Sequence, residues 1–127
     1  MQVDIITPEK VLFSNNDVSM VTIPGIEGQM GILDDHIPIV TFLRPGVINV
    51  ENKKNKYFFT TGGVVDFKNN ILSILCQDIY DIEELTDDKI TQLKNNANKK
   101  IKDENCTDHE AFISSSVLQE LNSLKAR

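Results

Sequence analysis

The hydrophobic periodicity of the chain changes once, at about residue 85, and this change limits the possible folds more than any other feature. Before it, short segments alternate apolar and polar residues with a period of two, which indicates half-buried β-strands. The residues expected to point inward in two of these segments are Ile48, Val50, Leu72, Ile74 and Cys76. Turn-forming residues separate the segments at Ser14-Asn15-Asn16, Pro24-Gly25, Arg44-Pro45-Gly46, Asn52 to Asn55, Gly62-Gly63 and Asn69-Asn70. Residues 1–85 are therefore predicted to form a β-sandwich or flattened barrel.

After residue 85 the apolar residues recur every three or four positions, which predicts helices. Thr86 is the expected N-cap of the first helix, with two aspartates in its first turn. Thr107 and Glu110 form a capping box that opens the second. The expected apolar faces are Ile90, Leu93, Ala97 and Ile101, and then Ile113, Val117, Leu118, Leu121 and Leu124. Residues 86–127 are predicted to form an antiparallel two-helix hairpin.

Composition restricts the possible partners. The net charge of -6 argues against nucleic acid, because phosphates would be repelled by an acidic surface. No apolar run approaches the roughly 18 residues that a membrane span requires, so we expect a soluble protein. The first ten residues lack the features of a secretory or transit signal, and the two cysteines lie far apart, which favours a reducing compartment. The expected partners are proteins or a small ligand.

Residues 25–46 combine four of the six glycines with an apolar run. The glycines predict a tight excursion that presents Glu27, Gln29 and Met30. In the following segment Ile37, Ile39 and Leu43 alternate with Val40 and Phe42, so both faces of the expected strand are apolar. An antiparallel sandwich normally leaves one face in water. The second face therefore needs cover, either from the helical hairpin or from another protein.

No motif in the chain supports catalysis. Asp34, Asp35 and His36 are adjacent, and neighbouring side chains on an extended chain point in different directions, so they are not expected to share a metal ion. His109-Glu110 resembles the start of a zinc-protease helix, but that motif requires a histidine where Ile113 stands. No phosphate-binding loop or nucleophile elbow is present, and the lysines after residue 88 are expected to form a solvated helix face.

Several motifs together resemble the epsilon subunits of bacterial and plastid rotary ATP synthases. The matching segments are ITPEK, Phe13-Ser14, PGIEGQMGILDDHIP, LRPG and FFTTGG, in the family's order and spacing across nearly all of residues 3–75. The resemblance implies a ten-stranded β-sandwich followed by two helices, located in the central stalk and rotating with it. It also implies that Glu27, Gly28, Gln29 and Met30 face the membrane c-ring. The strand beginning near His36 would bind the gamma subunit through His36, Ile37, Ile39, Val40, Thr41 and Phe42.

The implied function is mechanical: a non-catalytic rotor subunit that couples proton flow to ATP synthesis. The implied location is peripheral, on the cytoplasmic face of the bacterial inner membrane, or less favourably on the stromal side of the thylakoid. The hairpin would reach the alpha and beta subunits in those relatives that inhibit ATP hydrolysis, but here its second helix is short and carries few basic residues.

Some relatives bind ATP through a pattern of Ile or Leu, Asp, two variable residues, Arg and Ala. The corresponding segment here is Leu85-Thr86-Asp87-Asp88-Lys89-Ile90, in which three of the four specifying positions differ. Lys89 is the remaining candidate for a phosphate contact, and it lacks the planar fork of arginine. No cofactor and no metal are therefore expected.

Two other functions fit parts of the sequence. A free-standing sandwich that binds a small ligand, with the hairpin as a lid, predicts a monomer without an apolar interface. A small metal-dependent enzyme that uses Asp34 and His36 predicts a bound metal ion.

Overall fold

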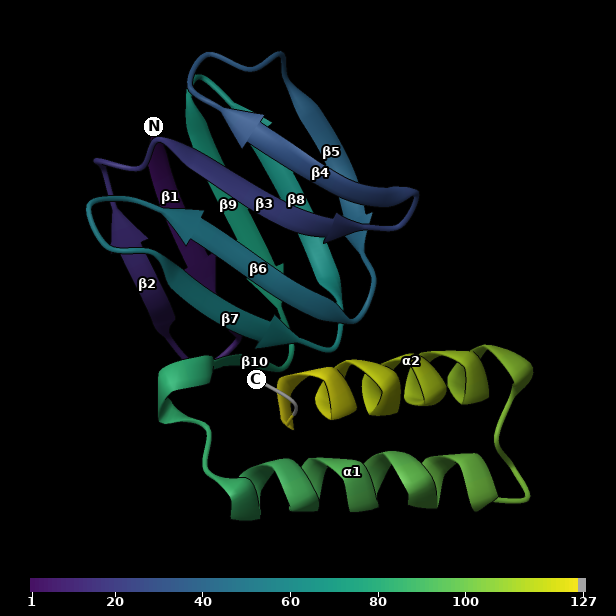
Figure 1. Ribbon diagram of the computed structural model, residues 1–127. Helices are drawn as coiled ribbons and strands as arrows, with labels where there is room; N and C mark the ends of the chain where they lie inside the picture. The colour runs from purple at the N-terminus through teal and green to yellow at the C-terminus, as the bar shows by residue number, and fades with distance from the viewer. Residues whose placement is uncertain (126–127) are drawn as a thin grey trace. The chain divides into compact units, whose positions relative to one another are not determined.

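The computed structural model describes residues 1–125, and the chain divides into two units, Met1–Ile82 and a second that begins at Glu83. Within the described residues the first unit holds ten strands (Figure 1). They are β1 (Gln2–Ile6), β2 (Val11–Asn15), β3 (Met20–Gly25), β4 (Gly28–Leu33), β5 (Ile39–Leu43), β6 (Gly46–Glu51), β7 (Lys56–Thr60), β8 (Gly63–Lys68), β9 (Ile71–Cys76) and β10 (Ile79–Asp81). The predicted fold class, a ten-stranded sandwich followed by two helices, is confirmed. The domain boundary at residue 85 stays a prediction.

The strands form two layers of one continuous sheet. One layer runs β10-β7-β6-β3, with β4 paired to the far edge of β3, and the other runs β5-β8-β9-β1-β2. A single pair, Gly25 with Leu43, joins β3 to β5 and so connects the layers. Strands β1 and β9 are parallel, with Gln2 beside Ile71. No local pattern in the sequence predicted that pairing, because the two strands lie nearly 70 residues apart in the chain.

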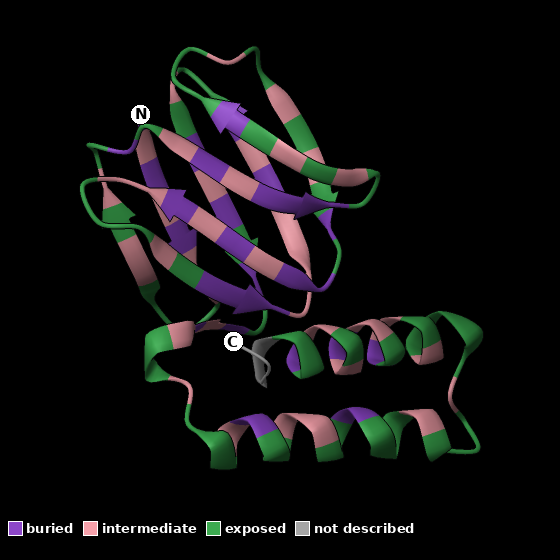
Figure 2. Ribbon diagram, viewed as in Figure 1, coloured by how far each residue is buried: buried purple, intermediate pink, exposed green. Residues whose placement is uncertain are grey.

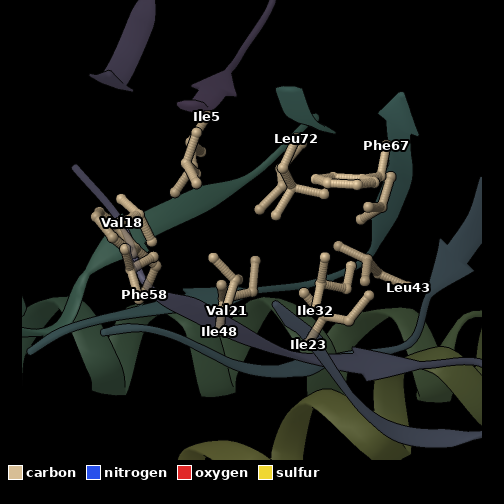
Figure 3. Packing of buried hydrophobic residues seen from close by; sticks show 14 of the residues in the cluster. Ile5, Val18, Val21, Ile23, Ile32, Leu43, Ile48, Phe58, Phe67 and Leu72 are labelled. Atoms are coloured by element: carbon tan, nitrogen blue, oxygen red, sulfur yellow. The ribbon is translucent and has the colours of Figure 1, made fainter. Parts of the chain in front are cut away.

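The core lies between the two layers and is largely apolar, with Thr60 of β7 among the few buried polar residues. Along β6 and β9 buried residues alternate with less buried ones, as predicted (Figure 2). Ile5, Phe67 and Leu72 point from one layer toward Val21 and Ile48 on the other (Figure 3). Burial of such aliphatic and aromatic side chains gives roughly 1.5–3 kcal/mol each, so this cluster is the main source of the sandwich's stability.

Most turns lie where glycine and asparagine predicted them. Asn69 and Asn70 both have positive φ, 52° and 61°, which is the geometry of a type I′ turn between β8 and β9. The prediction of a turn at Pro24-Gly25 is wrong, because both residues belong to β3 and the turn follows at Ile26 and Glu27. The predicted turn at Ser14–Asn16 also begins too early, since Ser14 and Asn15 still pair with β1.

The part of the second unit that the structure describes contains two α-helices, α1 (Asp87–Lys102) and α2 (Asp108–Lys125), which pack against each other. The 3₁₀ turn η1 (Ile82–Glu84) precedes them. Thr86 caps α1, because its Oγ1 accepts the backbone N–H of Lys89 at 3.2 Å. Thr107 Oγ1 likewise accepts the backbone N–H of Glu110 at 3.1 Å. Both predicted helix starts are confirmed.

The predicted apolar faces of the helices are also found. On α1, Ile90 and Ala97 are buried, and Leu93 and Ile101 are half-buried. On α2, Val117 and Leu121 are buried, and Ile113 and Leu118 are half-buried. The side chain of Leu124 lies outside the described residues. Ser114 is buried on α2 as well, which the sequence did not indicate; it precedes Val117 by three positions and so shares its face.

Candidate interaction surface

The glycine-rich excursion is a β-hairpin formed by β3 and β4. Gly25 pairs with Gly28, and Gly28 has φ of 133°, a value open to glycine, which closes a two-residue loop. The loop exposes Ile26, with 63% of its surface accessible, together with Glu27. Gln29 is exposed, but Met30 is half-buried and packs against the core. The hairpin therefore presents Ile26 in addition to the predicted polar residues.

The strand expected to begin near His36 begins three residues later, at Ile39. Asp35 has φ of 60°, and the backbone N–H of His36 donates to the Leu33 carbonyl at 3.1 Å, which forms a turn there. Pro38 has no N–H to give to a strand ladder. These features delay the strand, so the predicted start is corrected to Ile39.

Asp34 and Asp35 both contact Asn70, whereas His36 contacts other residues. The Asp34 carboxylate accepts from the Met1 α-ammonium at 2.6 Å and from Asn70 at 3.2 Å. These hydrogen bonds hold the pKa of Asp34 below its usual value, the one from the ammonium being the larger cause. The backbone N–H of Asp35 donates to the Asn70 side chain at 2.9 Å.

The His36 ring lies edge-on to Phe67, with 6.0 Å between centroids, and its Nδ1 is 2.7 Å from the Ile37 carbonyl oxygen. The trio thus ties the β4–β5 connection to the chain's first residue and to the β8–β9 turn. Among residues 1–125, no three His, Cys, Asp or Glu side chains are grouped so that they could hold a metal ion.

The residues predicted to bind the gamma subunit divide between the two faces of β5. Val40 and Phe42 point outward, with 69% and 60% of their surfaces accessible, and Ile37 just before the strand is 74% accessible. Ile39 packs against the core, and Thr41 pairs with the buried Val65. The outward set is a protruding apolar group at the edge of the sandwich.

An apolar row crosses the outer face of the same layer. Phe42 pairs with Val64, Val64 with Leu75, Leu75 with Ile6, and Ile6 with Val11. We call these five residues the apolar row; it spans β5, β8, β9, β1 and β2 in that order. Phe42, Leu75 and Val11 are 60%, 46% and 59% accessible, and the other two are half-buried.

Sequence reasoning identified only Phe42 in this row. The apolar residue at each second position was visible in the sequence, but the register that aligns the five strands was not. These exposures count against the alternative of a free-standing ligand-binding sandwich, which predicts no apolar interface.

Lys89 lies in the first turn of α1, half-buried, three residues after the N-cap. Its predicted role with a phosphate stays a prediction.

Both cysteines are free thiols. Burial raises the pKa of Cys76; partial desolvation and the nearby carboxylates of Glu110, Asp103 and Asp108 raise the pKa of Cys106. Neither thiol is activated for nucleophilic chemistry.

Comparison with known proteins shows which family has this architecture. The sequence model of the ATP synthase delta/epsilon chain β-sandwich domain matches residues 1–82, which is the whole of the first unit. The chain belongs to the ATP synthase delta/epsilon chain family. The family resemblance predicted from the motifs is therefore confirmed. The family match covers the sandwich that carries the apolar row.

Individual relatives agree with this family assignment. The ATP synthase epsilon chain of Pelagibacter ubique is 38% identical over 98% of this chain and 94% of its own length. The mitochondrial ATP synthase subunit delta of Schizosaccharomyces pombe is 36% identical, covering 90% of this chain and 71% of its own. A chain in the Euglena gracilis mitochondrial ATP synthase has the same fold, with a TM-score of 0.77 and 22% identity; the match covers 95% of this chain and 78% of that one.

No helix among residues 1–125 has the length and apolar character needed to cross a membrane.

Proposed function

We propose that the chain is the epsilon subunit of a rotary ATP synthase, a part of the central stalk that binds the gamma subunit and the c-ring. The family assignment supports membership of the ATP synthase complex. The exposed apolar residues on β5 support the position that we propose for the chain within that complex. Ile37, Val40 and Phe42 expose apolar surface that a free monomer would be expected to bury. A permanent partner subunit would cover it.

We assign gamma binding to the outward side of β5 and the connection before it, His36 to Phe42. Val40 and Phe42 are the expected anchors, because large apolar side chains at the centre of an interface contribute most of the binding energy. Ile39 and Thr41 point to the core side of β5, so their expected role is to fix the strand rather than to contact gamma.

We assign the c-ring contact to the tip of the β3–β4 hairpin. Glu27, Gly28 and Gln29 are presented there together with Ile26, on a two-residue loop that Gly28 closes. A short loop between two paired strands suits a part that must transmit torque without deforming. Met30 would support the tip through its packing on the core.

The role proposed for the chain is mechanical and not catalytic: it helps couple proton flow through the c-ring to ATP synthesis in the head of the complex. We propose a peripheral position at the cytoplasmic face of a bacterial inner membrane, held there through the complex. Because the ATP-binding pattern is incomplete around Lys89, we expect no nucleotide cofactor. Titration calorimetry with ATP, in which measurable heat would contradict this, checks the last point.

The experiment that tests the proposal is co-elution of the purified chain with its cognate gamma subunit in size-exclusion chromatography. A double variant, Val40→Asp with Phe42→Asp, should lose the complex, because two charges would be buried without partners. Tyr57→Asp is the matched control, since Tyr57 is an exposed aromatic residue on the other layer. A wild-type chain that elutes apart from gamma would refute the proposal.

A further inference from the structure

The outward residues of β5 are too few to account for a stable stalk interface. Specific protein interfaces bury about 800 Å² on each partner, contributed by roughly 20–30 residues. Strand β5 has five residues, of which only Val40 and Phe42 expose large apolar side chains. A partner held by this edge alone would bind weakly, so the covered surface must continue onto neighbouring elements.

The apolar row supplies that continuation. It starts at Phe42, which belongs to the proposed gamma-binding group, and it runs without a polar interruption through Val64, Leu75 and Ile6 to Val11. Adjacent strands lie about 4.8 Å apart, so five strands carry the row over about 19 Å. The order of these strands, β5-β8-β9-β1-β2, can be followed in Figure 1.

A second row lies beside the first and carries negative charge. Asp66 pairs with Ser73, and Ser73 pairs with Asp4. We call these three residues the acidic row. It is displaced from the apolar row by two residues along each strand, about 7 Å, and its two carboxylates are two strand spacings, about 10 Å, apart.

The two carboxylates differ in how they are held. Asp4 accepts hydrogen bonds from the side chains of Gln2 at 2.8 Å and Ser14 at 2.6 Å. Both donors are neutral side chains, so they orient the carboxylate without bringing an opposite charge to it. Asp66 takes part in no ion pair among residues 1–125. Lys68 is on the same face of β8, two residues further from the apolar row.

We propose that the gamma-binding surface extends from β5 across the layer to β2, and that the gamma segment covering it carries Lys or Arg side chains next to its apolar residues. This inference rests on the proposed function and names the extent and the chemistry of the same interface. Apolar contact along the row supplies the affinity, and the acidic row fixes the register by pairing with the partner's cations.

The test measures the dissociation constant of the full chain for immobilised gamma subunit by biolayer interferometry. Leu75→Asp and Val11→Asp lie at the middle and far end of the apolar row, away from β5, and each should weaken binding at least tenfold. Tyr57→Asp on the other layer is the matched control and should leave the affinity within twofold. Thermal unfolding of each variant confirms that it is folded; all three sites are substantially exposed.

The charge part of the proposal is tested in the same assay at two salt concentrations. Asp66→Asn should weaken binding about two- to fivefold at low salt and reduce its salt dependence, because a partly exposed ion pair is lost. Lys68→Gln is the matched control and should not weaken binding. An unchanged affinity for Asp66→Asn at both salt concentrations would overturn the charge assignment.

The outcomes separate this inference from the proposed function. If the wild-type chain does not bind gamma, the proposed function fails. A second outcome is that the wild-type chain binds gamma and the double variant Val40→Asp, Phe42→Asp does not. If Leu75→Asp and Val11→Asp then bind as well as Tyr57→Asp, gamma binding stands and the extended surface is refuted.

Discussion

Replacing Gly63 with alanine should destabilise the sandwich, because the close approach of β8 to β9 leaves no room for a Cβ. Gly63 pairs with Cys76, and a Cβ at position 63 would lie 2.8 Å from the Cys76 Sγ and 3.2 Å from its Cα; it would also overlap the Leu75 carbonyl oxygen. Two of these three atoms belong to the backbone of β9. They can move only if the β8–β9 ladder opens.

The magnitude follows from two opposing terms. Overpacking at a rigid site costs about 1–3 kcal/mol. Alanine also restricts the unfolded chain more than glycine does, which offsets about 0.4–1 kcal/mol. We expect the free energy of unfolding to fall by about 1–2 kcal/mol, a decrease in Tm of the order of 5–10 °C for a unit of this size.

Gly31→Ala provides the matched control, since it makes the same chemical change in another strand. There the new Cβ would meet only the Cε of Met20, at 2.5 Å, and this is the far end of a flexible side chain. Met20 can change rotamer, so Gly31→Ala should be neutral or slightly stabilising. Urea denaturation followed by far-ultraviolet circular dichroism measures both variants. Equal stability of Gly63→Ala and Gly31→Ala would refute the reasoning.

Three further predictions concern ionisation, thiols and local opening. Asp34→Asn should reduce stability near neutral pH and not at low pH. The pKa of Asp34 is lower in the folded state, so the ionised carboxylate stabilises the protein above the unfolded-state pKa, and this contribution is lost as the pH falls through the folded-state pKa. Parallel curves of unfolding free energy against pH for the two proteins would contradict this. Iodoacetamide should label Cys106 before Cys76, because Cys76 is buried. Both thiols should react slowly at pH 7.5, because the pKa of each is raised. Equal labelling rates of the two cysteines in mass spectrometry would count against the predicted order. Amides of α1 and α2 should exchange hydrogen faster than those of β3 and β8, since α1 fully buries only two side chains; uniform protection would argue the opposite.

The elements of this fold are largely encoded in local sequence. The alternation around Ile48 and Ile74 gave strands with the predicted inward faces, and Thr86 and Thr107 gave the helix starts. Such features depend on residues within a few positions of each other, because side-chain periodicity and capping are local effects.

The errors occurred where a contact distant in sequence changed a local preference. Pro24 and Gly25 read as a turn, yet they extend β3, because Gly25 pairs with both Gly28 and Leu43. The turn that delays β5 is formed locally around Asp35 and Pro38, and it is also held by a hydrogen bond between Asp34 and Asn70, which lie 36 residues apart. Neither pairing has a signal in the residues next to it.

The sequence by itself determined the family, the two kinds of secondary structure and the alternation that puts Val40 and Phe42 on the same face of their strand. Only the tertiary structure decided that Phe42, Val64, Leu75, Ile6 and Val11 form one row with Asp66 and Asp4 beside it. The physical reason is register: alternation fixes which face a side chain occupies, and backbone pairing between distant strands fixes which side chains become neighbours on that face.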